Sequence, residues 1–572
     1  MKGRSGLSTS SFVNVDIKFY ICICSNIIKS NKYMRKQWSP LWIIIVGLFG
    51  VSLGLIAQEK NLVLHKSFDN ESISFDSVEI RVSKSKISRD CFMPTYCTGV
   101  RGKALDLTDD IAVRTPVWVE KEETPDYSKN FSFSVWVQTK PGAYQGTAIL
   151  GNKKNYCPRL QSHSENRQVT DDQNFVDESK APGFLLGTTE MGGWYFYISD
   201  GKNTYTYFPT AERQRINDGL WHHLAMSLDW GKKELWLYFD GKNVAIYNVE
   251  DLTPAINSRT TVLGGADEFA EKGMHHSRGE WTAFNGRIDE VKFWNSVITS
   301  TSVEKEYIDY NPNKKDIIKF DTPDRIKVQV WNIWHGGRRS GYHVGLQRVI
   351  DVLKQEKADL IGLVETYGSG AVIADSLQYY YYLISDNLSI LSRYPIESTI
   401  QLYKSFRSGG AILNLSNNKK LAFFDIWLDW RTDDYRSADI EAIDDVLGKY
   451  AAKSDKVPVI VVGDFNSNSH LDQFPVRIST DPKIAWPSKV MVNNLGFSDS
   501  FREMNKDSKM FQGYTWSPMN NTALEKSKGW NRVDYIYYRG KDLKLYRSEK
   551  IDRHPILWPS DHASVVTYFY LK

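Results

Sequence analysis

The sequence contains few cysteines and carries little excess charge of either sign. Only five of its 572 residues are cysteine, and none of these lies in the C-terminal half. No group of cysteines and histidines has the spacing of a zinc site. The net charge of +4 is too small to indicate a protein that binds nucleic acid or an anionic membrane through charge alone. The composition therefore gives no support for a zinc module or for a strongly basic binding protein.

Long hydrophobic runs are also scarce, and the clearest one lies near the N-terminus. Met34 is followed by two basic residues, by an apolar stretch over residues 41–56, and by Ala57. This order is typical of a secretory signal peptide cleaved after Ala57, and the alternative is an uncleaved membrane anchor. Residues 1–33 show no periodic pattern, so we expect translation to begin at Met34. The protein would then be secreted, periplasmic or on the cell surface, and membrane-anchored if the segment stays uncleaved.

The length of the chain indicates two or three domains, because a single hydrophobic core rarely serves 572 residues. Cys91 and Cys97 are close enough in sequence to form a small disulfide loop in an exported protein. We divide the chain into an N-terminal extension with the signal peptide, a β domain, a linker and an α/β domain, at residues 1–57, 58–308, 309–324 and 325–572.

Residues 58–308 have the pattern of an all-β domain. Apolar and polar side chains alternate over residues 131–137, as expected of a strand with one buried face. Residues 193–198 and 235–239 are similar, and each is followed by a turn that contains glycine. A late strand is expected over residues 286–294. Many short strands separated by turns indicate a β-sandwich.

Four motifs in this half occur in the order found in laminin-G-like (concanavalin-A-like) jelly-roll domains. They are Gly102-Lys103-Ala104-Leu105-Asp106-Leu107, Asp218-Gly219-Leu220-Trp221-His222-His223, Leu237-Tyr238-Phe239-Asp240-Gly241 and Gly286-Arg287-Ile288-Asp289-Glu290-Val291. The resemblance implies a jelly roll of two sheets that acts as a glycan- or surface-binding module and often holds a structural Ca²⁺. Asp69 and Asp289 are the candidate calcium ligands, because Ca²⁺ prefers oxygen donors.

After the linker, strands and helices alternate, which places the C-terminal half in the α/β class. Strands are expected over residues 326–331, 360–364 and 457–462, and a helix over residues 346–357. Each of the three strands is followed by a polar side chain. These polar residues are Asn332, Glu365 and the pair Asp464 and Asn466.

The stretch from Val459 to Asn466 is the strongest single signal in the chain. Gly463 allows a sharp turn at the end of the strand. Asp464 and Asn466 are two residues apart, so they point to the same side of an extended backbone. A carboxylate beside an amide suits metal or phosphate chemistry. The alternative is a strand followed by a turn in which the aspartate bonds to the backbone.

A second polar group comes later in the chain. Asp534 lies inside an apolar strand, and Asp561 and His562 directly precede the last strand. An ionised carboxylate inside a core needs a partner, because burial of an unpaired charge is costly. Histidine is a suitable partner, so we expect Asp534 to hold His562 in one tautomer.

The C-terminal half resembles the endonuclease/exonuclease/phosphatase family, which has the DNase-I-like fold. The motifs that carry the resemblance appear in family order: Asn332, Leu363-Val364-Glu365-Thr366, Leu391-Ser392-Arg393-Tyr394-Pro395, Gly463-Asp464-Phe465-Asn466, Arg532-Val533-Asp534-Tyr535-Ile536 and Ser560-Asp561-His562. The fold class implied for the whole chain is multidomain, with an all-β jelly-roll sandwich followed by an α/β DNase-I-like four-layer sandwich.

The resemblance also implies metal-dependent hydrolysis of a phosphoester. Glu365 would be the principal ligand of a Mg²⁺ or Mn²⁺ ion, assisted by Asn332 and Asp561. In the catalytic set, Asp464 and Asn466 would position or deprotonate the attacking water. His562, held by Asp534, would bind or protonate the phosphoryl group.

One position departs from the family pattern. The family often carries a histidine in the strand before Asp464, and Trp427 stands at the corresponding place here. Indole donates one hydrogen bond but cannot carry a proton. Either another side chain contacts the phosphate or the activity is reduced. His335, Arg338 and Arg431 are the candidates for that contact.

Three functions are compatible with this sequence. The first is an exported metal-dependent phosphodiesterase or nuclease, with nucleic acid as the expected partner. The second is a lipid phosphodiesterase or a phosphatase of the same family. The third is a carbohydrate-binding adhesion protein with a degenerate catalytic half. The retained carboxylates and His562 argue against the third, because a site without function would be expected to lose them.

Overall fold

The computed structural model describes thirteen segments of the chain. They are residues 61–69, 95–108, 117–142, 147–153, 182–189, 191–210, 212–256, 260–265, 284–311, 323–415, 419–472, 478–518 and 530–572. The predicted signal peptide, the proposed start at Met34 and Cys91 lie outside these segments. Among the described residues, no helix is long and apolar enough to span a membrane.

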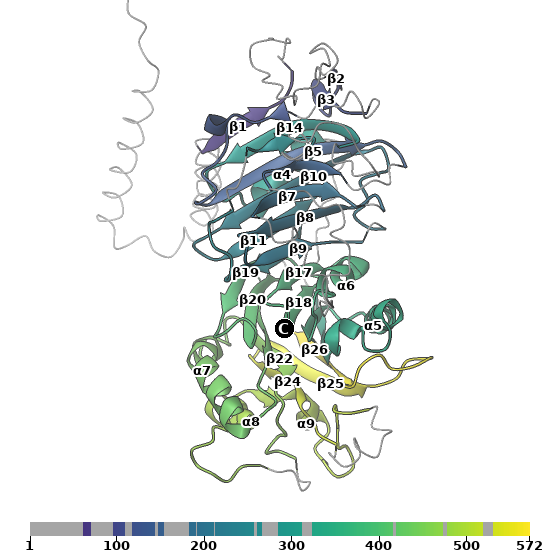
Figure 1. Cartoon of the computed structure of the whole chain (residues 1–572). Coiled ribbons are helices and arrows are strands. Elements are labelled where there is room, and N and C mark those ends of the chain that lie inside the picture. Colours follow the sequence, from purple (N-terminus) through teal and green to yellow (C-terminus); the bar gives the residue numbers. More distant parts are fainter. Residues whose placement is uncertain are drawn as a thin grey trace, which may run out of the picture. The chain divides into compact units, whose positions relative to one another are not determined.

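The first sheet of the N-terminal half has the strand order β2-β3-β14-β5-β10-β11-β12, and β1 pairs with β14 (Figure 1). Every pairing among these strands is antiparallel, as is typical of a sandwich. The strands are β1 (Leu62–Lys66), β2 (Thr95–Thr98), β3 (Lys103–Asp106), β5 (Phe131–Thr139), β10 (Trp221–Asp229), β11 (Glu234–Phe239), β12 (Lys242–Asn248) and β14 (Gly286–Trp294).

The second sheet of this half has the order β4-β13-β6-β7-β8-β9. Its strands are β4 (Val117–Trp118), β6 (Ala148–Gly151), β7 (Gly183–Thr188), β8 (Trp194–Ser199), β9 (Thr204–Tyr207) and β13 (Val262–Leu263). Apolar side chains from both sheets, among them Phe133, Phe184 and Phe196, form one buried cluster. The strands expected near residues 131, 193, 235 and 286 are all confirmed. We call residues 61–310 the jelly-roll domain.

Residues 323–572, here called the C-terminal domain, contain two further six-stranded arrangements. One has the order β17-β18-β16-β15-β26-β25 and the other β19-β20-β21-β22-β24-β23. The first comprises β15 (Arg325–Asn332), β16 (Leu360–Val364), β17 (Tyr380–Leu383), β18 (Leu388–Ser392), β25 (Leu543–Ile551) and β26 (Ser564–Leu571). The second comprises β19 (Ile396–Gln401), β20 (Ser408–Asn414), β21 (Lys420–Trp427), β22 (Val459–Asp464), β23 (Ser498–Asp499) and β24 (Asp534–Arg539).

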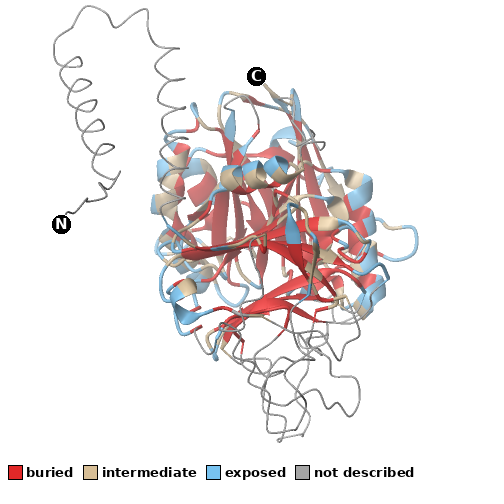
Figure 2. Ribbon diagram, turned by 90° about the horizontal axis from the view of Figure 1, so that it is seen from above, coloured by how far each residue is buried: buried red, intermediate tan, exposed pale blue. Residues whose placement is uncertain are grey.

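The alternation along β22 explains how the two sheets pack. Ile460 and Val462 belong to a cluster with Val328 and Val330 of β15, which fills the space between the sheets. Val459 and Val461 belong to a different cluster, which contains residues of α7. Successive strand residues face opposite sides, so β22 is buried on both faces. Figure 2 shows the strands of the molecule largely in red, the colour of buried residues, with paler helices around them.

The helices follow strands of both sheets. The predicted helix near residue 346 is confirmed and extends over Tyr342–Glu356. The helices are α4 (Ser300–Tyr310), α5 (Tyr342–Glu356), α6 (Gly370–Leu377), α7 (Asp433–Ala451), α8 (Pro487–Lys489) and α9 (Ser500–Met504). Helix α4 crosses the boundary that the sequence suggested at residue 308.

The two halves of the chain share a strand pairing. Strand β12 of the jelly-roll domain pairs in parallel with β17, with Ile246 opposite Tyr382. Side chains add to the contact, since Gln214 donates a 2.8 Å hydrogen bond to Asp375. Removing the jelly-roll domain would therefore expose the backbone of β17, and experiments on this protein are best done with the whole chain.

Candidate active site

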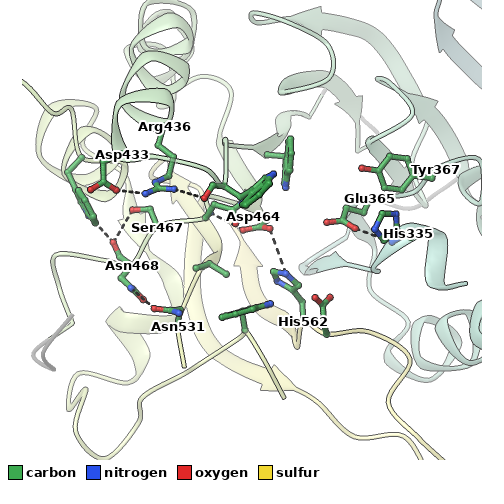
Figure 3. Close-up of a pocket in the computed structure, with 17 residues that line it drawn as sticks. His335, Glu365, Tyr367, Asp433, Arg436, Asp464, Ser467, Asn468, Asn531 and His562 are labelled. Carbon is green, nitrogen blue, oxygen red and sulfur yellow. Dashed lines mark hydrogen bonds and ion pairs between the residues drawn. The ribbon is translucent and has the colours of Figure 1, made fainter. Parts of the chain in front are cut away.

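A cleft of about 740 Å³ opens where strands of the two sheets of the C-terminal domain end (Figure 3). Its wall includes residues that the sequence singled out and several that it did not. The lining residues are His335, Glu365, Tyr367, Trp427, Trp430, Asp433, Arg436, Asp464, Asn466, Ser467, Asn468, Trp486, Trp516, Asn531, Val533, Asp561 and His562. Polar side chains at the ends of β16 and β22 thus line one cleft, together with Asp561 and His562, which precede β26.

The turn before Asp464 requires glycine. Gly463 has a φ of +148°, and a Cβ added to it would lie 1.9 Å from the carbonyl oxygen of Ile426. Any other residue would separate β21 from β22, so the glycine allows both strands to reach the cleft side by side. Trp427 and Asp464 are paired at this end of the two strands.

Asp464 is buried and its two oxygens have separate partners. Oδ1 accepts a 2.9 Å hydrogen bond from the backbone N–H of Asn466, and Oδ2 accepts a 3.2 Å hydrogen bond from Nδ2 of Asn332. The side chain of Asn466 donates to the carbonyl oxygen of Leu428 at 2.9 Å. Asp464 therefore both bonds the backbone in a turn and contributes a carboxylate to the polar site, so the two interpretations of this stretch are both correct. The backbone N–H of Asn466 holds that carboxylate in place.

Asp534 and His562 form the expected pair. Nδ1 of His562 is 2.9 Å from Oδ2 of Asp534. On the other side of the ring, Nε2 lies 3.5 Å from Nδ2 of Asn332 and 3.9 Å from Oδ2 of Asp464. The aspartate thus holds the ring by one nitrogen, while the other nitrogen faces Asp464 in the cleft wall (Figure 3).

Burial and charge act in opposite directions on His562. Burial by itself would lower the pKa of the imidazole, but the charges of Asp534 and then Asp464 outweigh it and raise the pKa. Burial, followed by repulsion from Asp534, raises the pKa of Asp464. The site therefore favours a protonated histidine beside a carboxyl group that takes up a proton easily.

Asn332 connects the two sheets within the site. Its Nδ2 donates to Oε1 of Glu365 at 3.1 Å as well as to Asp464. Its Oδ1 accepts a 3.0 Å hydrogen bond from the backbone N–H of Trp334. In this arrangement the Asn332 amide serves as a hydrogen-bond donor to two carboxylates, because its oxygen is already engaged by the backbone.

Two sets of residues could hold a metal ion. Asp464, Asp534 and His562 each place a ligand atom within 4.8 Å of the others. In that set, however, Nδ1 of His562 is already bonded to Asp534. Glu365 and Asp561 also line the cleft, and they offer the oxygen donors that Mg²⁺ and Mn²⁺ prefer.

The environment of Asp561 fits a cation near Glu365. Oδ1 of Asp561 is buried and has no hydrogen-bond partner among the described residues. Burial raises the pKa of Asp561. The charge of His562 opposes this rise, and repulsion from Glu365, which is weaker than the effect of His562, adds to it. A divalent cation would satisfy the orphaned oxygen and offset the repulsion. Glu365 and Asp561 are therefore candidate ligands for a divalent cation, and both oxygens of Glu365 accept hydrogen bonds in the structure, from Asn332 and from the N–H of His335. The Asp534–His562 pair is suited to proton chemistry.

Of the candidate phosphate contacts, His335 lines the cleft, and its ring is stacked on Tyr367 with 5.2 Å between centroids. Arg338 instead donates to the carbonyl oxygen of Tyr367 at 3.2 Å. Arg431 forms an ion pair with Asp429. Neither arginine is among the residues that line the cleft.

Trp427 lines the cleft where the family often has histidine. The guanidinium carbon of Arg407 lies 4.5 Å from the centre of its ring, and Phe406 packs edge-on at 5.5 Å. Arg407 itself pairs with Asp429 at 2.6 Å. The tryptophan is thus held by neighbours outside the cleft and contributes an apolar surface to it.

The candidate calcium ligands of the jelly-roll domain both accept hydrogen bonds from the segment that leads from β2 into β3. Oδ1 of Asp69 accepts a 2.8 Å hydrogen bond from the backbone N–H of Lys103. Asp289 accepts hydrogen bonds from the N–H groups of Arg101 and Glu290, at 3.3 Å and 2.8 Å. Among the described residues, neither aspartate belongs to a cluster of three metal-ligating side chains. Their contacts in the structure are with the backbone of the jelly roll.

Sequence reasoning missed Thr515 and the left-hand wall of the cleft in Figure 3. Oγ1 of Thr515 accepts hydrogen bonds from the N–H groups of Val533 and Asp534, both at 3.1 Å, and its carbonyl oxygen accepts one from Ala563. Thr515 thus positions the two segments that carry the Asp–His pair. Asn468 follows Asp464 and Asn466 at the same spacing of two residues, and this pattern could have predicted that Asn468 lines the cleft.

The fold and the site together define the class of protein. A two-sheet α/β domain with Glu365, Asp464 and His562 in the wall of one cleft has the DNase-I-like fold, here preceded by a jelly roll. Comparison with known families agrees: residues 330–562 match the Endonuclease/Exonuclease/phosphatase family. Residues 116–304 match the Concanavalin A-like lectin/glucanases superfamily. Each half of the chain thus matches one family model.

Similar proteins have been found in animals. An uncharacterized protein of Caenorhabditis elegans, F14F9.5, is 24% identical over 294 residues, which cover 43% of this chain and 91% of that protein. Among solved structures, truncated C. elegans TDP2 is 20% identical with a TM-score of 0.33, covering 43% of this chain and 97% of that one. The human Nocturnin catalytic domain is 17% identical with a TM-score of 0.34, covering 44% and 97%.

Proposed function

We propose that the protein is an exported, metal-dependent phosphodiesterase whose reaction takes place in the cleft around Asp464 and His562. The single observation that carries the proposal is the position of His562: one ring nitrogen is 2.9 Å from Asp534 and the other faces Asp464 at 3.9 Å in the cleft wall. A buried Asp–His pair that opens onto a cleft is suited to proton transfer at a bound phosphate.

The residues of the chain divide the work of hydrolysis. Asp464, fixed by Asn332 and Asn466, orients the attacking water and accepts its proton. His562 hydrogen-bonds a phosphoryl oxygen and stabilises the charge that develops there. A Mg²⁺ or Mn²⁺ ion held by Glu365 and Asp561 would neutralise phosphoryl charge and lower the pKa of bound water.

The test is hydrolysis of bis-(p-nitrophenyl) phosphate by the purified protein with Mg²⁺, with Mn²⁺ and with EDTA. We expect turnover that requires the metal and that falls by about a hundredfold or more in Asp464→Asn, because the variant cannot accept a proton from water. Absence of turnover with either metal, on this diester and on p-nitrophenyl phosphate, would contradict the proposal and favour a binding protein.

The jelly-roll domain is proposed to attach the enzyme to a glycan-bearing surface, which would raise the local substrate concentration. This proposal is supported by the match to concanavalin-A-like lectins. The whole chain should be retained on a polysaccharide resin and released by the matching soluble sugar. Passage through a panel of such resins without delay would contradict the attachment.

Export is proposed from the apolar stretch over residues 41–56, which lies outside the described segments. N-terminal sequencing of the mature protein should find Gln58 as the first residue. A mature protein that still begins at Met34 would support the membrane anchor instead.

A further inference from the structure

The cleft has two sides, and the proposed reaction uses only one of them. In Figure 3, Glu365 and His335 lie to one side of Asp464, and Asn468 and Asn531 lie to the other. The first side holds the proposed metal ligand. The second side has no role in the reaction described above, so it is available for the part of the substrate that does not react.

Tryptophan is concentrated in the lining of this cleft. Trp486 is buried, and its Nε1 donates a 2.8 Å hydrogen bond to the carbonyl oxygen of Asn468. Trp516 is held by backbone bridges to Asn531 and His562. The ring of Trp486 and the backbone of Trp516 are therefore held by segments that carry other lining residues, and both side chains add apolar surface to the wall.

Trp430 differs from these two tryptophans because it is free to contact a ligand. Its side chain lines the cleft although 66% of the residue is exposed to solvent. Large aromatic surfaces left in water beside a cleft commonly mark a binding site. A planar group that stacks on Trp430 would bury this surface.

The charges around the second side do not suit a long polyanion. Among the described residues that line the cleft, Arg436 is the only arginine and there is no lysine, and Arg436 already pairs with Asp433. A nucleic-acid groove needs several free cations along the phosphate backbone. Because Asp433 is neutralised by Arg436, this side also lacks a free carboxylate for a cationic group such as choline.

We propose that Trp430, Trp486 and Trp516, with the amide of Asn531, form a subsite for an uncharged planar group attached to the reacting phosphate. Asn468 supports this subsite by donating a 2.8 Å hydrogen bond to Oδ1 of Asn531. The substrate is then a small phosphodiester of a nucleoside or of an aryl alcohol, with a single phosphate. This inference rests on the proposed phosphodiesterase function and names its substrate class.

The kinetic test compares two diesters that share p-nitrophenolate as leaving group: thymidine 5′-(p-nitrophenyl phosphate) and methyl p-nitrophenyl phosphate. The wild-type protein should prefer the thymidine ester in kcat/KM. Trp430→Ala should reduce this preference about tenfold, mainly through KM, as expected for the loss of one stacking ring. Trp430→Phe should retain most of it.

Tyr403→Ala is the matched control, because Tyr403 is an aromatic residue of the same domain that is 41% exposed and does not line the cleft. This variant should leave the preference unchanged. Equal kcat/KM values for both esters, or a preference that survives Trp430→Ala, would overturn the subsite. Faster turnover of p-nitrophenylphosphorylcholine than of the thymidine ester would also overturn the subsite, as would faster turnover of single-stranded DNA per phosphodiester bond.

A binding measurement separates failure of the subsite from failure of the proposed function. Thymidine 5′-monophosphate should quench the tryptophan fluorescence of the wild-type protein, and Trp430→Ala should weaken its affinity about tenfold. Such binding without hydrolysis of any ester would retain the subsite and reject the phosphodiesterase. Hydrolysis of bis-(p-nitrophenyl) phosphate without binding of the nucleotide would retain the enzyme and reject the subsite.

Discussion

Each of the two domains contains a histidine that pairs with aspartate, and the contrast between them shows what distinguishes a site from a structural contact. In the jelly-roll domain, Nδ1 of His222 is 3.1 Å from Asp240 and Nε2 is 3.1 Å from Asp218. In the C-terminal domain, His562 bonds Asp534 through Nδ1, and its Nε2 faces Asp464 at a longer 3.9 Å.

The consequence lies in what the second nitrogen can do. His222 has both nitrogens engaged by carboxylates, and the two aspartates raise its pKa against the effect of burial. It therefore connects the segment before β10 to the turn between β11 and β12. His562 keeps one nitrogen in the wall of a cleft, where a phosphate can reach it. A buried Asp–His pair is catalytic only when one nitrogen remains available to a ligand.

The largest effect is expected from loss of the metal. EDTA should reduce hydrolysis of bis-(p-nitrophenyl) phosphate to the background rate, and Glu365→Gln should lower kcat/KM by about a thousandfold, since a metal supplies several kcal/mol of transition-state stabilisation. Added Mg²⁺ or Mn²⁺ should restore the treated wild-type protein.

The matched control for that prediction is Glu290→Gln in the jelly-roll domain. Glu290 is buried, whereas Glu365 is half-buried, and it is hydrogen-bonded to His65 and Tyr310, both at 2.6 Å, outside the cleft. Turnover should be unchanged in this variant. A similar loss in both variants would mean that Glu365 supports folding and does not hold the metal.

The next largest effect is expected at the aspartate partners of the two histidines. Asp534→Asn should lower kcat by about a hundredfold, because the amide no longer stabilises the protonated imidazole of His562. Asp240→Asn, which changes the partner of His222 in the same way, should leave kcat unchanged. Steady-state kinetics on the same diester compares the two, and an equal kcat for both variants would remove the distinction between the histidines.

Much of the candidate site in the C-terminal domain could be predicted from the sequence. The strand ends at Asn332, Glu365 and Asp464 and the turn at Gly463 followed from local patterns, because strand periodicity and glycine depend on neighbouring residues. The Asp534–His562 pair followed instead from the cost of burying an unpaired carboxylate. The role of Asn332 as a hydrogen-bond donor could not be predicted from local patterns, since the direction of its amide depends on Trp334 and on Glu365 of the next strand.

The second side of the cleft was not predictable for a similar reason. Trp430, Trp486 and Trp516 lie on separate segments of the chain, and a tryptophan in a sequence looks the same in a core as in a cleft. The engagement of Arg338 and Arg431 by other groups was equally hidden. Only tertiary contacts decide whether a cation is free to bind a phosphate.

A smaller effect concerns a buried acid of the jelly-roll domain. Burial raises the pKa of Asp289 to about 7. An aspartate has a pKa of about 3.9 when unfolded, so the folded state binds more protons between these values, and stability falls as pH rises through this range. Asp289→Asn removes this titration. The unfolding free energy of the variant minus that of the wild type should therefore rise by about 2 kcal/mol when the pH is raised from 5 to 8.

Urea unfolding followed by tryptophan fluorescence at the two pH values measures this change. Asp126→Asn serves as the control, because Asp126 is exposed and hydrogen bonds from Ser128 lower its pKa, to about 2. That variant should show no gain between pH 5 and pH 8, since the carboxyl is ionised at both. An equal response of the two variants would contradict the assignment to Asp289.

The smallest effect is expected from Trp427→His. Imidazole can donate a hydrogen bond to phosphate and carry a charge, so kcat/KM should rise, but His335 and His562 already line the cleft. An increase of less than about tenfold is expected from one added hydrogen bond. A hundredfold increase would mean that Trp427 has largely disabled the site.

The most direct test of the central claim is a side-by-side measurement of His562→Asn and His222→Asn on bis-(p-nitrophenyl) phosphate with Mg²⁺. We expect kcat to fall by about a hundredfold or more in His562→Asn and to be unchanged in His222→Asn. Circular dichroism should show that both variants are folded. Wild-type turnover in folded His562→Asn would contradict the central claim, because the reaction would then not depend on the histidine that opens onto the cleft.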